Sequence, residues 1–191
     1  MNTRIFLARI ISILGHPGVL GSFAIATKLS NTPTSTHVKT VVISTMLLVT
    51  VLGLAYSVWQ VQRGYWSHID ASKPNERAQL LPILLLLLGI ATLSLWALDM
   101  PKQVVSGPIA GIALVLAAHS VRHWMKPSLH VGFGILATGL NNTLPVDVIL
   151  LAATALVGWS RLALGRHTRR EVAVGAALGA AAAALFRSMS E

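Results

Sequence analysis

Seven long apolar stretches follow one another along the 191-residue sequence, and they constrain the fold more than any other feature. About 20 apolar residues in a helix are enough to cross the hydrocarbon core of a bilayer. A backbone that faces lipid satisfies its hydrogen bonds within its own segment, so such stretches form helices. They cover residues 5–27, 38–61, 80–98, 104–121, 128–140, 146–159 and 172–185. The sequence therefore predicts an all-α integral membrane helical bundle of about six to seven apolar helices.

The overall composition agrees with a membrane location. Hydrophobic residues make up 54% of the sequence and charged residues 11%, with a mean hydropathy of +0.69. A soluble domain of this length needs far more charge to cover its surface. The sequence has no cysteine, which excludes a disulfide framework or a thiolate metal site. Because no small-residue cleavage site follows the first stretch, we expect it to stay as an anchor of a single membrane domain over residues 1–191.

Two of the stretches, 128–140 and 146–159, are short for full spans. The turn between them, residues 141–145, contains two Asn residues and a Pro. We expect a helical hairpin that does not cross the whole hydrocarbon layer. In the last stretch Gly175 and Gly179 stand one helical turn apart, a spacing that lets helices approach closely.

Basic residues gather on one of the two faces that alternating spans create. Of the 15 Lys and Arg residues, 11 lie near the N-terminus or in the connections 62–79, 122–127 and 160–171. The other face holds Lys28, Lys39, Lys102 and Arg187. Charge divided among short loops of a membrane protein fits recognition of anionic lipid headgroups, and we expect no nucleic-acid partner. The excess of positive charge also favours a cytoplasmic position for this face.

Three segments of the basic face hold residue types suited to phosphate-ester cleavage, namely 73–77, 126–130 and 160–171. Arg offers a planar fork of donors that matches phosphate oxygens, and Lys and Ser add further donors. One His can attack phosphorus, and a second can act as general acid and base. Glu171 stands four residues after His167, where on one helical face it can fix the tautomer of the ring. These donors need no metal to neutralise the phosphoryl oxygens.

The same segments resemble the signature of the type-2 phosphatidic acid phosphatase and vanadium haloperoxidase superfamily. Its third motif is matched by Ser160-Arg161, Gly165 and His167, with Glu171 where the family has Asp. Its second motif, Pro-Ser-Gly-His, is matched by Pro127-Ser128-Leu129-His130, with Leu in place of Gly. Of the first motif only Arg77 fits, Asp70 stands where the family has Lys, and Lys126 can substitute for it. The likeness spans about residues 70–179.

The resemblance implies a phosphatase-like core over about residues 63–187, with the helices of residues 5–61 as an addition. It implies that His167 is the nucleophile, that His130 is the general acid and that Glu171 orients His167. It assigns phosphate binding to Arg77, Lys126, Ser128, Arg161 and the backbone near Leu129. The expected activity is metal-independent hydrolysis of a membrane lipid phosphate, such as a phosphatidate, a phosphatidylglycerol phosphate or a polyprenyl phosphate, through a phosphohistidine and without a cofactor.

Other interpretations stay open beside this one. The departures at Leu129 and Glu171 favour an inactive relative that binds anionic lipid, and a scaffold or small transporter would also explain a basic face. We expect Arg166, Arg169 and Arg170 to be solvated or lipid-facing charge. The pair His119 and His123 lacks acidic partners, so we expect no metal site there.

We expect His16-Pro17 to mark a kink with a hydrogen-bonded imidazole. The expected location is the bacterial cytoplasmic membrane, and the sequence predicts no particular oligomeric state.

Overall fold

Eight helices make up the regular secondary structure of the computed structural model, which describes residues 3–71, 73–141 and 143–191. Within these residues there is no strand. The helices are α1 (Thr3–Leu14), α2 (Pro17–Asn31), α3 (Thr36–Gln62), α4 (Pro74–Ala97), α5 (Lys102–Ser120), α6 (Leu129–Gly139), α7 (Leu144–Ala163) and α8 (Arg169–Ser190). Five of them, α3, α4, α5, α7 and α8, are long and apolar enough to cross a membrane. The predicted helical membrane bundle is confirmed at this level.

The first apolar stretch forms two helices rather than one. Helices α1 and α2 meet at Gly15 and His16 with a bend of 50°, and they are long and apolar enough for a membrane span only when the two are taken together. Pro17 carries no amide hydrogen and disfavours a helical residue before it, which explains a break at this point. The imidazole Nδ1 of His16 accepts a hydrogen bond from the Gly18 amide at 3.1 Å and so caps α2. The predicted kink with a bonded imidazole is confirmed.

Of the two helices predicted to be short, only α6 is short. Its 11 residues rise about 16 Å, roughly half of a 30 Å hydrocarbon core. Helix α7 has 20 residues and continues through Ser160 and Arg161, beyond the predicted end at 159. The prediction for α7 was wrong because hydropathy falls at these polar residues whereas the helix does not stop. Asn142, in the turn before α7, lies outside the described residues.

The carbonyl end of α6 is bound by side chains from other helices. The Lys28 ammonium donates to the Leu140 carbonyl at 2.6 Å, and Arg187 Nε donates to the Gly139 carbonyl at 3.5 Å. The Asn141 amide donates to the Ala24 carbonyl at 3.0 Å. A half-length helix that ends inside the bundle thus has partners for its last carbonyls.

Helices α6 and α8 lie in close contact along lines of small residues. A Cβ added at Gly175 would come within 2.5 Å of the Ser128 carbonyl oxygen, and one at Gly179 within 2.3 Å of the Gly132 carbonyl oxygen. Neither position has room for a side chain. The close approach predicted from Gly175 and Gly179 is confirmed, and it brings the first turns of α6 and α8 together.

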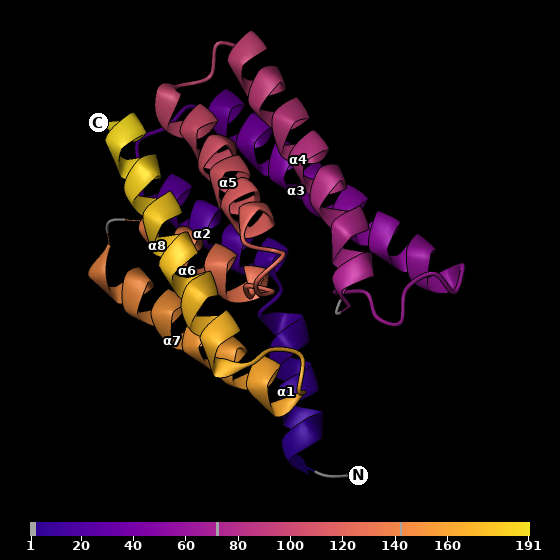
Figure 1. Cartoon of the computed structure of the whole chain (residues 1–191). Coiled ribbons are helices and arrows are strands. Elements are labelled where there is room, and N and C mark those ends of the chain that lie inside the picture. Colours follow the sequence, from indigo (N-terminus) through magenta and orange to yellow (C-terminus); the bar gives the residue numbers. More distant parts are fainter. Residues whose placement is uncertain (1–2, 72, 142) are drawn as a thin grey trace.

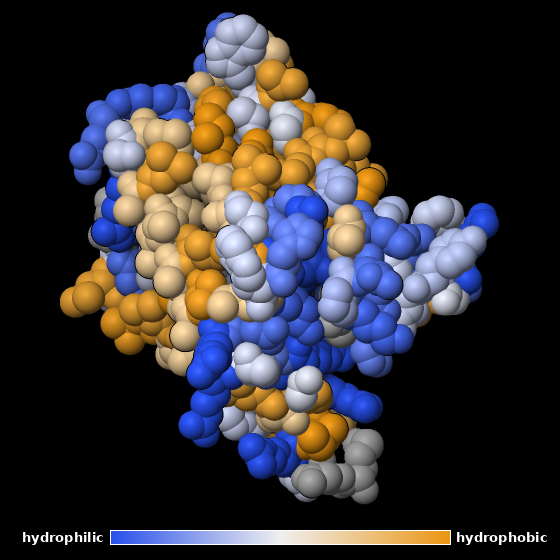
Figure 2. Space-filling model, viewed as in Figure 1, coloured by the Kyte–Doolittle hydropathy of each residue, from blue (hydrophilic) through white to orange (hydrophobic). Residues whose placement is uncertain are grey.

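The connections α3–α4, α5–α6 and α7–α8 lie toward the same end of the bundle, from which α1 extends further, and the connections α2–α3 and α4–α5 lie at the opposite end (Figure 1). We call the end formed by residues 63–71, 73, 121–128 and 164–168 the loop end, and the end formed by residues 32–35 and 98–101 the far end. Hydrophilic residues are concentrated over the loop end and apolar residues over the helices above it (Figure 2).

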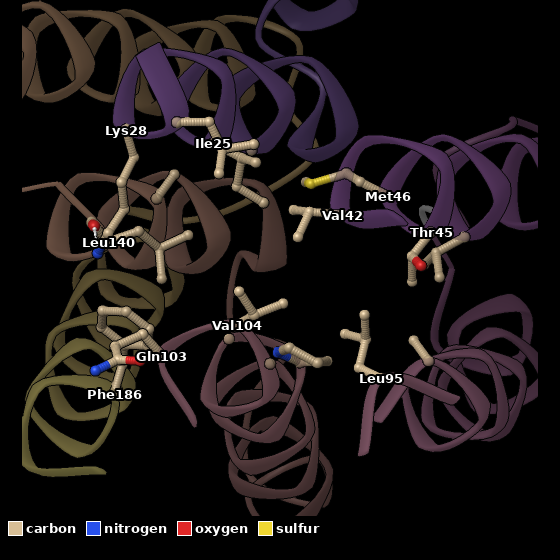
Figure 3. A pocket seen from close by; sticks show the side chains of 18 of the residues that line it. Ile25, Lys28, Val42, Thr45, Met46, Leu95, Gln103, Val104, Leu140 and Phe186 are labelled. Atoms are coloured by element: carbon tan, nitrogen blue, oxygen red, sulfur yellow. Dashed lines mark hydrogen bonds between the residues drawn. The ribbon is translucent and has the colours of Figure 1, made fainter. Parts of the chain in front are cut away.

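An apolar cavity of about 660 Å³ lies among α2, α3, α4, α5 and α6, toward the far end (Figure 3).

Candidate functional site

Arg77 stands in the first turn of α4, at the loop end. Pro74 begins the helix, and the Glu76 carboxylate accepts from the backbone amides of Ser67 at 2.7 Å and Lys73 at 3.0 Å. These bonds tie the loop 63–73 to the helix. Arg77 Nη1 donates to the Pro127 carbonyl at 2.5 Å, which joins α4 to the segment before α6. The Nε of Arg77 is buried and has no hydrogen-bond partner among the described residues.

Ser128 is the N-cap residue of α6 and is fully buried. Its amide donates to the Glu171 carbonyl at 3.0 Å, so α8 holds it in place. Its hydroxyl Oγ does not cap the helix and finds no partner in the described part of the chain. The first amides of α6 have no carbonyl partner within the helix and carry its positive dipole end. Such an end is suited to an anion.

Leu129, which stands where the family motif has Gly, lies in the hydrophobic core. Its side chain belongs to a cluster of buried apolar residues with Leu81, Val115 and Ala118. The larger residue is therefore absorbed by packing between α4, α5 and α6.

His167 lies in the connection between α7 and α8 and is 8% exposed. Its Nδ1 is 3.2 Å from the Lys126 carbonyl oxygen and 3.4 Å from Oε2 of Glu171. Both neighbours are acceptors only, so Nδ1 carries the ring proton and Nε2 keeps its lone pair. This arrangement leaves Nε2 available as a nucleophile.

The contact between His167 and Glu171 arises differently from the expected helical pair. His167 precedes α8, and Thr168 is its N-cap residue. The Glu171 carboxylate accepts from the Thr168 amide at 2.9 Å, and the Thr168 hydroxyl accepts from the Glu171 amide at 3.3 Å. This capping box turns the carboxylate back toward the connection, where His167 lies.

The surroundings of His167 keep its ring neutral. Burial lowers the pKa of His167 to about 3, and nearby positive charges act in the same direction against Glu171. The positive charges are Arg77, Arg161 and Lys126. Burial also lowers the pKa of Lys126. A ring surrounded by three cations is thus unprotonated at neutral pH.

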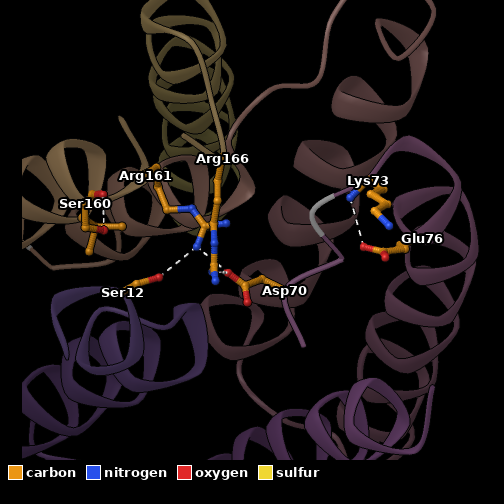
Figure 4. Close-up of polar contacts among 8 residues, drawn as sticks. Ser12, Asp70, Lys73, Glu76, Ser160, Arg161 and Arg166 are labelled. Carbon is orange, nitrogen blue, oxygen red and sulfur yellow. Dashed lines mark hydrogen bonds and ion pairs between the residues drawn. The ribbon is translucent and has the colours of Figure 1, made fainter. Parts of the chain in front are cut away.

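Arg161 is 1% exposed and stands in the last turn of α7. Its Nη1 donates to the Ser12 hydroxyl at 2.8 Å and to the Asp70 carboxylate at 2.5 Å (Figure 4). Its Nε is buried without a partner among the described residues. Arg161 is therefore held by its Nη1 group, and its Nε remains as a donor for a ligand.

Arg166 forms an ion pair with the same Asp70 oxygen, so the prediction that Arg166 is solvated or lipid-facing charge was wrong. Arg166 turns toward the protein because the largely buried carboxylate of Asp70 attracts its guanidinium group as well as that of Arg161. Burial alone would raise the pKa of Asp70, but Arg161, followed by His130 and Arg166, lowers it well below its usual range. Arg169 and Arg170 are exposed, as predicted.

His130 lies in the first turn of α6 and contacts His16 edge to face. The ring centroids are 5.6 Å apart at an interplanar angle of 89°. His130 also interacts electrostatically with Asp70, Arg161 and His167. It lies in the same charged region as His167, although no hydrogen bond joins the two rings in the described part of the chain. We call Arg77, Lys126, Ser128, His130, Arg161 and His167 the loop-end cluster.

Three residues of this region were missed as site residues by sequence reasoning: Ser12, His16 and Asp70. Ser12 and His16 come from the α1–α2 pair, which the resemblance places outside the core. The break at His16-Pro17 was a visible signal of an unusual position, but nothing in the spacing indicated its neighbours. Among residues 3–71, 73–141 and 143–191, no three His, Cys, Asp or Glu side chains come together in a way that could hold a metal ion.

Comparison of the chain with models of known protein families, with curated proteins and with solved structures gives no match.

Proposed function

We propose that this protein is a metal-independent lipid phosphate phosphatase that works through a phosphohistidine at His167. The observation that carries the proposal is a set of three buried donors without partners among the described residues, two of them on guanidinium groups whose charges act on the neutral imidazole of His167. The donors are Arg77 Nε, Arg161 Nε and Ser128 Oγ. A buried polar group left unbonded costs about 1–3 kcal/mol, so three in one place favour a ligand that binds them all.

The charge of the cluster favours phosphate over a carboxylate ligand. A phosphate ester presents several oxygens and up to two negative charges, whereas a carboxylate presents two oxygens and one charge. Two guanidinium groups, the Lys126 ammonium and the positive end of α6 fit the larger charge. The chain's five candidate membrane spans favour the headgroup of a lipid as the source of that phosphate.

The chemistry follows from the two histidines. The lone pair on Nε2 of His167 attacks phosphorus, and the bond from phosphorus to the lipid oxygen breaks. The negative charge of the bound phosphate favours the protonated form of His130, which donates its proton to the leaving oxygen. Water then attacks the phosphohistidine, His130 takes the proton from that water, and the phosphorus–nitrogen bond breaks to release inorganic phosphate. The Lys126 carbonyl and Glu171 stabilise the ring of His167 while it carries positive charge.

The resemblance to the type-2 phosphatidic acid phosphatases supports the same roles. Two departures from the family pattern are compatible with activity. Leu129 packs in the core, so its side chain does not fill the space beside Ser128. Glu171 reaches His167 through the capping box, so a longer side chain than Asp is accommodated. We place this activity on the cytoplasmic side of a bacterial cytoplasmic membrane, because the loop end carries most of the basic residues.

The test is release of inorganic phosphate from a panel of lipid phosphates by the purified protein in detergent with a metal chelator. Wild type is expected to release phosphate from at least one lipid. His167→Ala is expected to abolish release, and His68→Ala, at an exposed histidine of the same face, to leave it unchanged. Activity that survives in His167→Ala or requires a divalent metal would contradict the mechanism.

A second candidate is binding of anionic lipid without hydrolysis. It is favoured by Asp70, whose carboxylate already engages Arg161 and Arg166 at the position where the family has a Lys. In the same experiment it predicts that wild type binds lipid phosphates but releases no phosphate.

A further inference from the structure

The apolar cavity among α2–α6 is large enough for part of a lipid. Its volume of about 660 Å³ falls in the range of small-molecule sites, about 300–1,000 Å³. Most of its lining is aliphatic or aromatic, as Figure 3 shows for Ile25, Val42, Leu95, Val104, Leu140 and Phe186. The apolar side chains that line an unfilled cavity lack neighbours on one side and lose the dispersion contacts that those neighbours would make. An apolar ligand that fills the cavity restores these contacts and is therefore favoured.

The near end of the cavity reaches the neighbours of the loop-end cluster. Pro17 and Thr50 line it there. Pro17 follows His16 directly, and a Cβ added at Gly18 would meet both the Thr50 side chain at 2.4 Å and His16 Nδ1 at 3.3 Å. The His16 ring in turn contacts the ring of His130. The cavity lining at Pro17 is thus directly bonded to His16, whose imidazole contacts the ring of the proposed general acid.

The cavity extends from this point to the far end of the bundle. Helix α2 lines it from Pro17 to Leu29, a rise of about 18 Å. An extended hydrocarbon chain that begins beside His16 would therefore lie parallel to α2 and run most of the way to the opposite membrane surface.

Lys28, the charged residue in the lining of the cavity, does not offer a second headgroup site. The Lys28 ammonium donates to the Leu140 carbonyl at 2.6 Å and lies 4.9 Å from the centroid of the Phe186 ring. Its charge is already bound to the carbonyl end of α6 and an aromatic face. The far end is suited to the tail of a chain.

We propose that this cavity holds the hydrocarbon chain of the same lipid whose phosphate binds the loop-end cluster. The inference rests on the proposed function and names its substrate class: lipid phosphates with a long linear chain that enters the protein, rather than short or water-soluble phosphate esters. The chain anchors the substrate, and its length determines how much of the cavity wall it contacts.

The chain offers a matched pair of glycines for a test. Gly107 in α5 lines the cavity, and Gly89 in α4 does not. A Cβ at either position has nothing within 4 Å, so both accept a side chain. Gly107→Phe places a ring in the cavity, whereas Gly89→Phe adds the same ring outside it.

Phosphate release is measured with long-chain and four-carbon alkyl phosphates. For Gly107→Phe we expect kcat/KM to fall at least tenfold with the long chain and to stay unchanged with the short one. Gly89→Phe should match wild type with both. Equal effects of the two variants, or no preference of wild type for the long chain, would overturn the inference.

A second measurement does not depend on turnover. A long-chain alkyl phosphate with a diazirine at the chain end is bound to the purified protein, irradiated and mapped by mass spectrometry. We expect labels on cavity residues such as Val104 and Leu140, and not on exposed Leu47 or Leu93. The alcohol of the same length, which lacks phosphate, should label the cavity much less.

The outcomes separate the two proposals. Cavity labelling by the phosphate, without any phosphate release, contradicts the phosphatase and supports the chain site. Release without cavity labelling contradicts the chain site alone. Equal cavity labelling by the alcohol identifies the occupant as ordinary bilayer lipid and overturns the inference.

Discussion

His167 shows how a buried position and its neighbours define the chemistry of one side chain. The ring lies among three cations, yet it is held by a backbone carbonyl and a carboxylate that accept from Nδ1. The cations disfavour the doubly protonated, charged ring. In the neutral ring, the two acceptors keep the single proton on Nδ1. A neutral and oriented imidazole is the form that the proposed attack on phosphorus requires.

The low pKa of His167 can be checked without any substrate. A histidine in water titrates near pH 6.5, whereas the His167 ring, with a pKa of about 3, stays neutral down to pH 5. We expect the ¹³C-labelled ring signal that disappears in His167→Gln to keep its chemical shift from pH 8 to pH 5. A titration of that signal with a midpoint near pH 6.5 would contradict the described environment.

Asp70 offers a second test at this scale. Asp70→Asn removes the negative charge between Arg161 and Arg166, so those guanidinium groups become stronger attractors for an anion. We expect inorganic phosphate or vanadate to bind about tenfold more tightly, as measured by calorimetry in detergent.

Asp99→Asn, which changes an exposed carboxylate at the far end, serves as the control and should leave the affinity unchanged. Weaker anion binding in Asp70→Asn would show that the carboxylate orients Arg161 for the ligand instead of competing with it.

The residues of the loop-end cluster could be named from sequence because their spacing within each segment is regular. Ser128 and His130 are two apart, and Arg161 and His167 six apart. The contacts of Ser12 and Asp70 with Arg161 could not be predicted, because each joins segments more than 90 residues apart in the chain. Contacts of that kind depend on packing, which no local pattern encodes.

At the scale of elements, the glycines between α6 and α8 position the site. Gly175 lets α8 contact the backbone of Ser128, and this approach permits the bond from the Ser128 amide to the Glu171 carbonyl. The small-residue pattern made this packing predictable. The end of α7 could not be predicted from the sequence. The helix continues through the buried Arg161, whose bonds are to Ser12 and Asp70 in distant segments.

Gly175→Ala tests this packing with the smallest possible change. The new Cβ would lie 2.5 Å from the Ser128 carbonyl oxygen, so α8 has to move away. We expect a loss of about 1–3 kcal/mol of stability, measured as chemical unfolding in detergent, together with reduced phosphate release.

Gly89→Ala is the matched control, since nothing lies near its added Cβ. Alanine is the better helix former by up to about 1 kcal/mol, so this variant should be as stable as wild type or more so. A stable Gly175→Ala protein would show that the two helices are not held at this distance.

For the whole molecule, the division of charge between the two ends predicts its orientation. Eleven of the 15 basic residues belong to the basic face, and the positive-inside rule places that face in the cytoplasm. The sequence predicts alternating faces because each apolar stretch is separated from the next by polar residues. The pair α1 and α2, bent by 50°, passes the test for a membrane span only as a pair, so the side on which the chain begins stays a prediction.

Orientation is directly testable because the sequence has no cysteine. We expect His68→Cys, at the loop end, to react with a membrane-impermeant maleimide only after the cells are opened. Thr34→Cys, at the far end, should react in intact cells. The reverse pattern would place the loop-end cluster on the outer side, and the basic residues would then reflect the ligand alone.

Helix α6 is electrically balanced at only one of its two ends. Lys28 and Arg187 sit permanently against its carbonyl end, and no side chain caps its amide end at Ser128. An anion bound at the amide end would lie beside the positive end of the helix dipole, just as Lys28 and Arg187 lie beside its negative end. Replacing Lys28 with a neutral residue should therefore remove the bond to the Leu140 carbonyl and also lower the affinity for an anion at the other end of α6.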